Sequence, residues 1–121
     1  MSRILIVEEM KGVRKLIAAR LKEAGYDIVE CETTNSGVEA LKTQKFDLVI
    51  TAILMTGHDG TEILQYIETL AHKPKVIAVS GGNDQIPAEM ALLLAKPQAN
   101  ITLKKPLNED HLLEAVKQLL A

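Results

Sequence analysis

Five short apolar runs, each followed by apolar residues at helical spacing, constrain the fold of this chain more than any other feature. The runs occupy residues 4–7, 27–31, 48–51, 76–79 and 101–103. The first of them is rich in β-branched residues, which is typical of a strand buried on both faces. Strands that alternate with helices form a parallel sheet with helices on both faces. The 121 residues therefore predict one α/β domain, residues 1–121.

The stretches between the runs predict amphipathic helices. Apolar residues recur at helical spacing over 13–24, and Gly25 is expected to end that helix. Ser36 and Glu39 predict a capping box that opens the second helix. Asp59 has the form of the third helix start, and Pro87 is expected in the first turn of the fourth. The last three helices are predicted from apolar residues spaced through 63–70, 86–94 and 112–120.

Composition narrows the classes of function. Hydrophobic residues make up 47% of the chain but aromatic residues only 2%, so the core is predicted to be aliphatic. The net charge of −2 and the lack of a basic stripe argue against direct nucleic-acid binding. The apolar run before Glu8 is too short for a signal peptide or a membrane span. Cys31 is the only cysteine, which excludes an internal disulfide and favours a cytoplasmic location.

Ligands of parallel sheets bind at the edge where the strands end. The residues predicted there are Glu8 and Glu9 after the first strand, Ala52 after the third, Ser80 after the fourth, and Lys104 and Lys105 after the fifth. Alternation along the strand places Lys104 opposite Lys105, facing solvent. Alanine at the third position can neither attack a substrate, coordinate a metal nor carry charge.

The segments ILIVEE, DLVITAILM, DG, VIAVSGG and LKKP, in this order, resemble those of a response regulator receiver domain. The resemblance extends from Arg3 to Leu120. It implies a flavodoxin-like (βα)5 three-layer sandwich with strand order 2-1-3-4-5, in a two-component phosphorelay protein that is not an enzyme. In that family an acidic pair helps to hold Mg²⁺, and an aspartate ending the third strand accepts a phosphoryl group from a histidine kinase. A Ser or Thr and a Lys contact the phosphoryl oxygens.

Position by position, the resemblance assigns Glu8 and Glu9 to the acidic pair, Ser80 to the hydroxyl position and Lys105 to the lysine. Ala52 falls at the place of the phosphoacceptor aspartate.

Two further positions depart from the family pattern and one agrees with it. Thr102 falls at the switch position, where many receivers have an aromatic residue, and Thr56 falls where a proline usually stands. Pro106 follows the lysine, and the resemblance implies a cis bond before it.

A methyl group supplies no lone pair, so phosphorylation at Ala52 is excluded. The charges of Glu8, Glu9 and Lys105 sum to −1, instead of the −2 of a site with three carboxylates and one lysine. We therefore expect no Mg²⁺ binding, or weak binding, and a direct pairing of Lys105 with Glu8 or Glu9. The chain is predicted to be a pseudo-receiver that acts by protein–protein interaction.

Two alternatives stay open at this point. Position 52 could carry an engineered Asp-to-Ala change in a conventional receiver. The chain could also be a small flavodoxin-like enzyme or nucleotide binder, although no glycine-rich phosphate loop follows the first strand. The histidines His58, His72 and His111 have no Cys or carboxylate at ligand spacing and are read as surface residues.

By resemblance, the partner is a histidine kinase or a downstream effector, or a second copy of the chain. The contact surface is expected on the fourth helix, fifth strand and fifth helix, within residues 85–120. The exposed contacts predicted there are Lys96, Gln98, Asn100 and Lys104.

Overall fold

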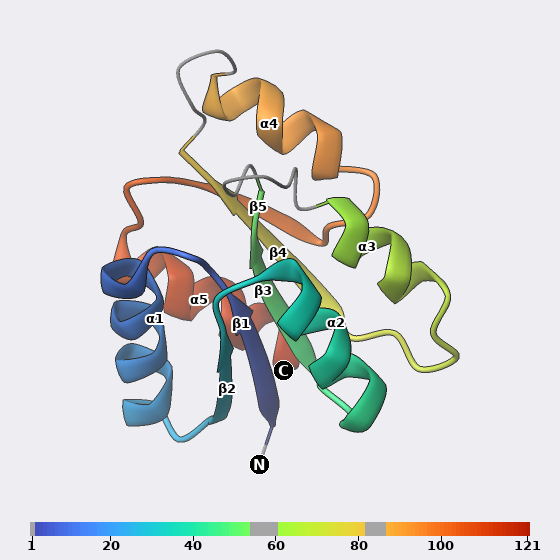
Figure 1. Cartoon of the computed structure of the whole chain (residues 1–121). Helices are drawn as coiled ribbons and strands as arrows, with labels where there is room; N and C mark the ends of the chain where they lie inside the picture. Colours follow the sequence, from blue (N-terminus) through green and yellow to red (C-terminus); the bar gives the residue numbers. More distant parts are fainter. Residues whose placement is uncertain (1, 54–60, 82–86) are drawn as a thin grey trace.

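The computed structural model describes residues 2–53, 61–81 and 87–121, and strands and helices alternate along them (Figure 1). In chain order the described elements are β1 (Arg3–Val7), α1 (Lys11–Glu23), β2 (Asp27–Cys31), α2 (Thr34–Thr43), β3 (Leu48–Ala52), α3 (Thr61–Glu68), β4 (Lys75–Ser80), α4 (Ala88–Ala95), β5 (Ile101–Lys104) and α5 (Glu109–Leu120). None of the described helices has the length and apolarity that a bilayer crossing requires.

The strands form one parallel sheet in the order β2-β1-β3-β4-β5. This confirms the flavodoxin-like order that the resemblance implies. In Figure 1, α1 and α5 lie on one face of the sheet, and α2, α3 and α4 lie on the other. The fold is therefore the expected three-layer sandwich, and the ends of the parallel strands meet along one edge.

Each face of the sheet buries its own apolar cluster, because successive residues of a strand point to opposite faces. Ile4 and Ile6 of β1 belong to the cluster under α1 and α5, whereas Leu5 and Val7 belong to the cluster under α2, α3 and α4. Among the buried residues that the structure describes, Phe46 is the only aromatic one. The aliphatic core expected from the composition is thus confirmed.

The start of α2 differs from the prediction. Its capping box is formed by Thr33 and Ser36, not by Ser36 and Glu39. The Ser36 N–H donates to Thr33 Oγ1 at 3.0 Å, and the Thr33 N–H donates to Ser36 Oγ at 3.2 Å. A serine at the third helical position thus supplies the reciprocal acceptor that a glutamate or glutamine usually supplies. Glu39 lies almost a turn further along and pairs with Lys42 at 3.3 Å.

The other helix ends lie near the predicted positions where they are described. α1 ends at Glu23, and Gly25 adopts a φ of 98°, the left-handed conformation that often follows a helix. Pro87, expected in the first turn of α4, lies instead at its N-cap, one residue earlier. The third helix start expected at Asp59 lies outside the described residues.

Gly37 brings α2 close to the end of β1. A Cβ atom at this position would lie 2.7 Å from Val7 Cγ2, closer than real Cβ contacts allow, and 3.0 Å from Ile63 Cδ1, which is also tight. The absence of a side chain therefore lets α2 pack directly on the strand end that leads into Glu8.

Candidate functional site

Four of the predicted site residues end or directly follow four adjacent strands. The pairs in register at this edge are Val7 with Thr51, Ala52 with Val79, and Ser80 with Lys104. Glu8 follows β1, Ala52 ends β3, Ser80 ends β4 and Lys105 follows β5. The strand order therefore places these residues along one stretch of the sheet edge, as the sequence predicts.

Three of these four residues are almost completely buried. Glu8 is 3% exposed, Ala52 4% and Ser80 1%. A carboxylate at this depth loses most of its hydration, which costs free energy unless a cation or hydrogen-bond donors replace the lost water. The position of Glu8 therefore calls for a partner.

Lys105 is that partner. Its Nζ forms an ion pair with Glu8 Oε1, between side chains that are 20% and 4% exposed. The other carboxylate oxygen, Oε2, accepts a hydrogen bond from the Met10 N–H at 3.2 Å. The Met10 Sδ lies 4.0 Å from Lys105 Nζ. Both oxygens of Glu8 are thus engaged, and the direct pairing with Lys105 expected from the charge balance is confirmed.

The backbone of Lys105 contacts the end of β4. The Lys105 N–H donates to the Ser80 carbonyl oxygen at 2.9 Å, and the Lys105–Pro106 peptide bond is cis, as the resemblance implies. A Cβ atom at Gly81 would lie 3.3 Å from Lys105 Cβ and 3.5 Å from Lys105 Cδ. Gly81 therefore leaves room for the aliphatic part of the lysine to lie against the β4 exit.

Arg14 holds the loop that carries the acidic pair, and the sequence analysis did not identify it. Its Nη1 donates to the carbonyl oxygens of Glu8 at 2.8 Å and Glu9 at 3.5 Å. Its Nε pairs with Glu30 at 3.5 Å, and the arginine is only 8% exposed. The signal in the sequence is an arginine next to Val13 on a helix face that otherwise buries apolar residues.

Ala52 belongs to the apolar cluster under α2, α3 and α4. Its methyl group offers neither a lone pair nor a charge. The neighbouring Thr51 is fully buried, and its hydroxyl donates to the Ala52 carbonyl oxygen at 3.4 Å. The nearest hydroxyl along the strand is thus directed to the backbone inside the core and is not available as a nucleophile at the surface.

The remaining predicted positions lie near the strand ends that carry Glu8, Ala52, Ser80 and Lys105. Glu9 is exposed, and Thr102 is half-buried in β5, in register with Ala78 of β4. Lys104 faces solvent, as alternation predicts, and pairs with Glu89 of α4.

Other sequence candidates lie away from this group or outside the described ranges. Cys31 ends β2 half-buried against the core, and burial raises the pKa of its thiol. His72 and His111 are exposed. Thr56 and His58 lie outside the described residues.

The carboxylates predicted to hold Mg²⁺ at this edge are Glu8 and the exposed Glu9. Magnesium requires near-octahedral oxygen coordination. Of the candidates, Ala52 contributes no oxygen from its side chain, and Glu8 already pairs with Lys105. Among the residues that the structure describes, no three His, Cys, Asp or Glu side chains are grouped so that they could hold a metal.

The family model described as "Response regulator receiver domain" matches residues 4–117 of the chain. The transcriptional regulatory protein GlrR of Escherichia coli (strain K12) is 30% identical over 118 residues, which make up 97% of this chain and 26% of GlrR. The chain thus spans about a quarter of the length of that curated relative.

Solved structures share the fold. A CheY-like receiver domain protein from Methanospirillum hungatei JF-1 has a TM-score of 0.86 at 27% identity, covering 99% of this chain and 94% of that one. The response regulator TrrA from Thermotoga maritima, in complex with Mg²⁺-BeF, has a TM-score of 0.81 at 28% identity, covering 98% and 99%. A structure of the histidine kinase ThkA in complex with TrrA matches with a TM-score of 0.81 at 30% identity, covering 100% of both chains.

Proposed function

The chain belongs to the response regulator receiver domain family, and we propose that it signals by binding a protein partner, without being phosphorylated at position 52. Receiver domains are signalling domains of two-component systems. What we propose is the way in which this receiver domain transmits a signal. It rests on one observation: the buried Glu8 carboxylate pairs with Lys105 at a strand edge where β3 ends in Ala52.

The ion pair supports the proposal through charge. We assign Ala52 to the place of the phosphoacceptor, Glu8 and Glu9 to the place of the metal-binding pair, and Ser80 and Lys105 to the places that contact the phosphoryl group. In this assignment the lysine has no phosphoryl oxygen to bind, and it neutralises Glu8 instead. With the charge of Glu8 balanced, the site requires no Mg²⁺ for stability, so metal binding is expected to be absent or weak.

Chemical phosphorylation tests this assignment. The chain is incubated with acetyl phosphate and Mg²⁺, and its intact mass is measured by mass spectrometry. We expect no added phosphoryl group, because a methyl group has no nucleophilic lone pair. A stable phosphoryl adduct on the unmodified chain would overturn the proposal and reveal another acceptor.

The variant Ala52→Asp is the matched comparison in the same assay. Efficient labelling of this variant would favour the alternative that the chain is a conventional receiver with an altered acceptor. Absence of labelling in the presence of Mg²⁺ supports a site that has lost the chemistry at more than one position.

We place the partner surface on α4, β5 and α5. In α4, Met90 is 60% exposed and Leu93 63% exposed, which are large apolar areas for a surface helix. Beside them Lys104 of β5 pairs with Glu89, and its ammonium group lowers the pKa of that carboxyl. An apolar patch with a polar rim suits a protein contact, and TrrA shows that a relative can bind a histidine kinase.

This surface is also the candidate for pairing with a second copy of the chain. Sedimentation velocity of the chain at increasing concentration is expected to show a dimer that Leu93→Glu shifts at least about tenfold toward monomer, because burying a carboxylate is unfavourable. Leu16→Glu, on an exposed apolar residue of α1, is the matched control. Equal dimerisation of Leu93→Glu and the unmodified chain would exclude this surface.

A cytoplasmic location, favoured by the single cysteine Cys31, stays a prediction alongside this function.

A further inference from the structure

A hollow lies at the opposite edge of the sheet from Glu8 and Lys105, and it offers a binding site separate from the proposed signalling surface. It has a volume of about 480 Å³ and is open to solvent on one side. The end of α2 and the α2–β3 connection line it from one side, and residues 70–74, between α3 and β4, line it from the other. These elements come together next to the starts of β3 and β4.

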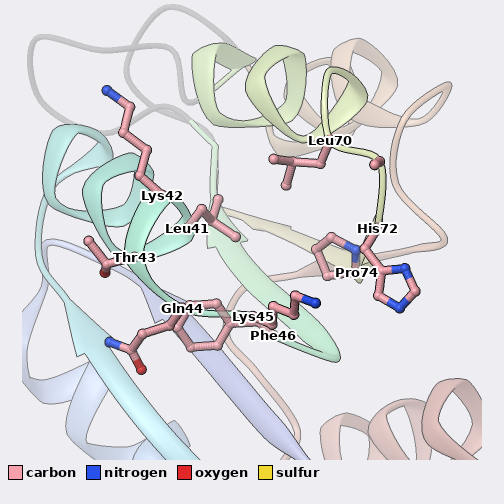
Figure 2. Close-up of a pocket in the computed structure, with 10 residues that line it drawn as sticks. Leu41, Lys42, Thr43, Gln44, Lys45, Phe46, Leu70, His72 and Pro74 are labelled. Atoms are coloured by element: carbon pink, nitrogen blue, oxygen red, sulfur yellow. The ribbon is translucent and has the colours of Figure 1, made fainter.

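The floor of the hollow is apolar. Leu41 and Phe46 are 7% and 8% exposed, Pro74 is buried and Leu70 is half-buried. Figure 2 shows Leu41, Leu70 and Pro74 pointing toward one another across the hollow. Such a floor accommodates an aliphatic or aromatic side chain, which gains free energy when its surface is removed from water.

The rim of the hollow carries two lysines and no carboxylate. They are Lys42 and Lys45, although the chain as a whole carries a net charge of −2. Lys42 already pairs with Glu39 and points away from the hollow in Figure 2. Lys45 makes no ion pair within the described part of the chain, and its ammonium group points toward the side of Pro74 and His72.

We propose that this hollow binds an acidic segment of a protein partner, with one apolar side chain on the floor and carboxylates near Lys45. Charge complementarity identifies the occupant, because Lys45, on a rim that no carboxylate lines, attracts anionic groups and disfavours basic ones. The open shape favours a peptide anchor over a small molecule, since small-molecule sites enclose most of their ligand. The hollow and the candidate site lie at opposite edges of the sheet, so both can be occupied together.

The test uses ¹⁵N-labelled chain titrated with the peptide Ac-Asp-Glu-Leu-Phe-Glu-Asp-NH₂. We expect amide shifts confined to residues 41–46 and 70–73. Binding should weaken about tenfold in Lys45→Glu, because the substitution removes one attraction and adds one repulsion. Lys11→Glu makes the same charge change at the opposite edge and should leave the affinity unchanged.

Two control peptides separate the contribution of the acidic residues from that of the apolar side chains. A peptide with lysines in place of the acids should not bind, and one with alanines in place of Leu and Phe should bind more weakly. The inference is overturned if millimolar peptide causes no shifts at 41–46 and 70–73, if Lys45→Glu binds as tightly as the unmodified chain, or if the shifts concentrate on α4. None of these results bears on phosphorylation at position 52, which the acetyl phosphate assay reports separately.

Discussion

Replacing Lys105 with methionine is expected to lower the free energy of unfolding by about 3 kcal/mol. The substitution keeps most of the apolar stem but removes the ammonium group that pairs with Glu8. The carboxylate is left 4% exposed with only the Met10 N–H at 3.2 Å as a described donor to its side chain. An uncompensated buried charge typically costs about 3–5 kcal/mol, and the lower end applies because Lys105 itself is 20% exposed.

Removing the charge of Glu8 instead should lower the free energy of unfolding much less. In Glu8→Gln the carboxylate is replaced by an amide of the same size, and the partly exposed lysine can turn toward water. We expect a loss of about 1 kcal/mol, close to that of one hydrogen bond. This asymmetry distinguishes a buried carboxylate that needs Lys105 from an ion pair that merely lies at the surface.

Urea unfolding of the unmodified chain, both single variants and the double variant gives the coupling energy between the two side chains. The double variant should be more stable than the sum of the single losses predicts, by about 1 kcal/mol or more. Equal losses in Lys105→Met and Glu8→Gln, with no coupling, would contradict the requirement of Glu8 for its partner.

The sequence predicts the fold well because its signals are local and periodic. The apolar runs mark all five strands, and the helical spacing marks the helices between them. The strand order itself came from the family resemblance, since periodicity does not say which strands are neighbours. The predicted capping box of the second helix was wrong for a physical reason. Ser36 serves as the acceptor at the third helical position of α2, whereas the prediction gave this role to Glu39, the more usual residue type.

In the candidate site, the sequence predicts the ion pair of Lys105, because counting charges is enough for it. Carboxylates that outnumber cations at the strand edge predict a pairing of Lys105 with Glu8 or Glu9, and the structure shows Glu8. Arg14 was missed because a charged residue is normally assigned to solvent, although its helical spacing places it on the same face as the buried Ile17 and Leu21. Its guanidinium is buried against backbone carbonyls of the β1–α1 loop. The hollow between residues 41–46 and 70–74 was also missed, since it forms where two non-periodic connections meet in space.

A substitution at position 52 is expected to have the second large effect on stability. Ala52→Asp is expected to lower the free energy of unfolding by about 2 kcal/mol in the absence of metal. The position is 4% exposed, so the new carboxylate loses hydration. By the strand register it also comes near Glu8, whose charge Lys105 already neutralises, so like charges repel. One lysine cannot balance both carboxylates.

Millimolar Mg²⁺ should restore at least about half of this loss, because a divalent cation can bind the carboxylates that Lys105 leaves unbalanced. Ala52→Asn is the matched control: it adds a polar side chain of similar size without charge, and its stability should not respond to Mg²⁺. The unmodified chain should respond as little as the asparagine variant, because its Glu8 is already paired. Thermal and urea unfolding with and without Mg²⁺ measure these differences. If the aspartate variant and the unmodified chain respond equally to Mg²⁺, then the Ala52 side chain does not face this group of charges, and the assignment of position 52 is wrong.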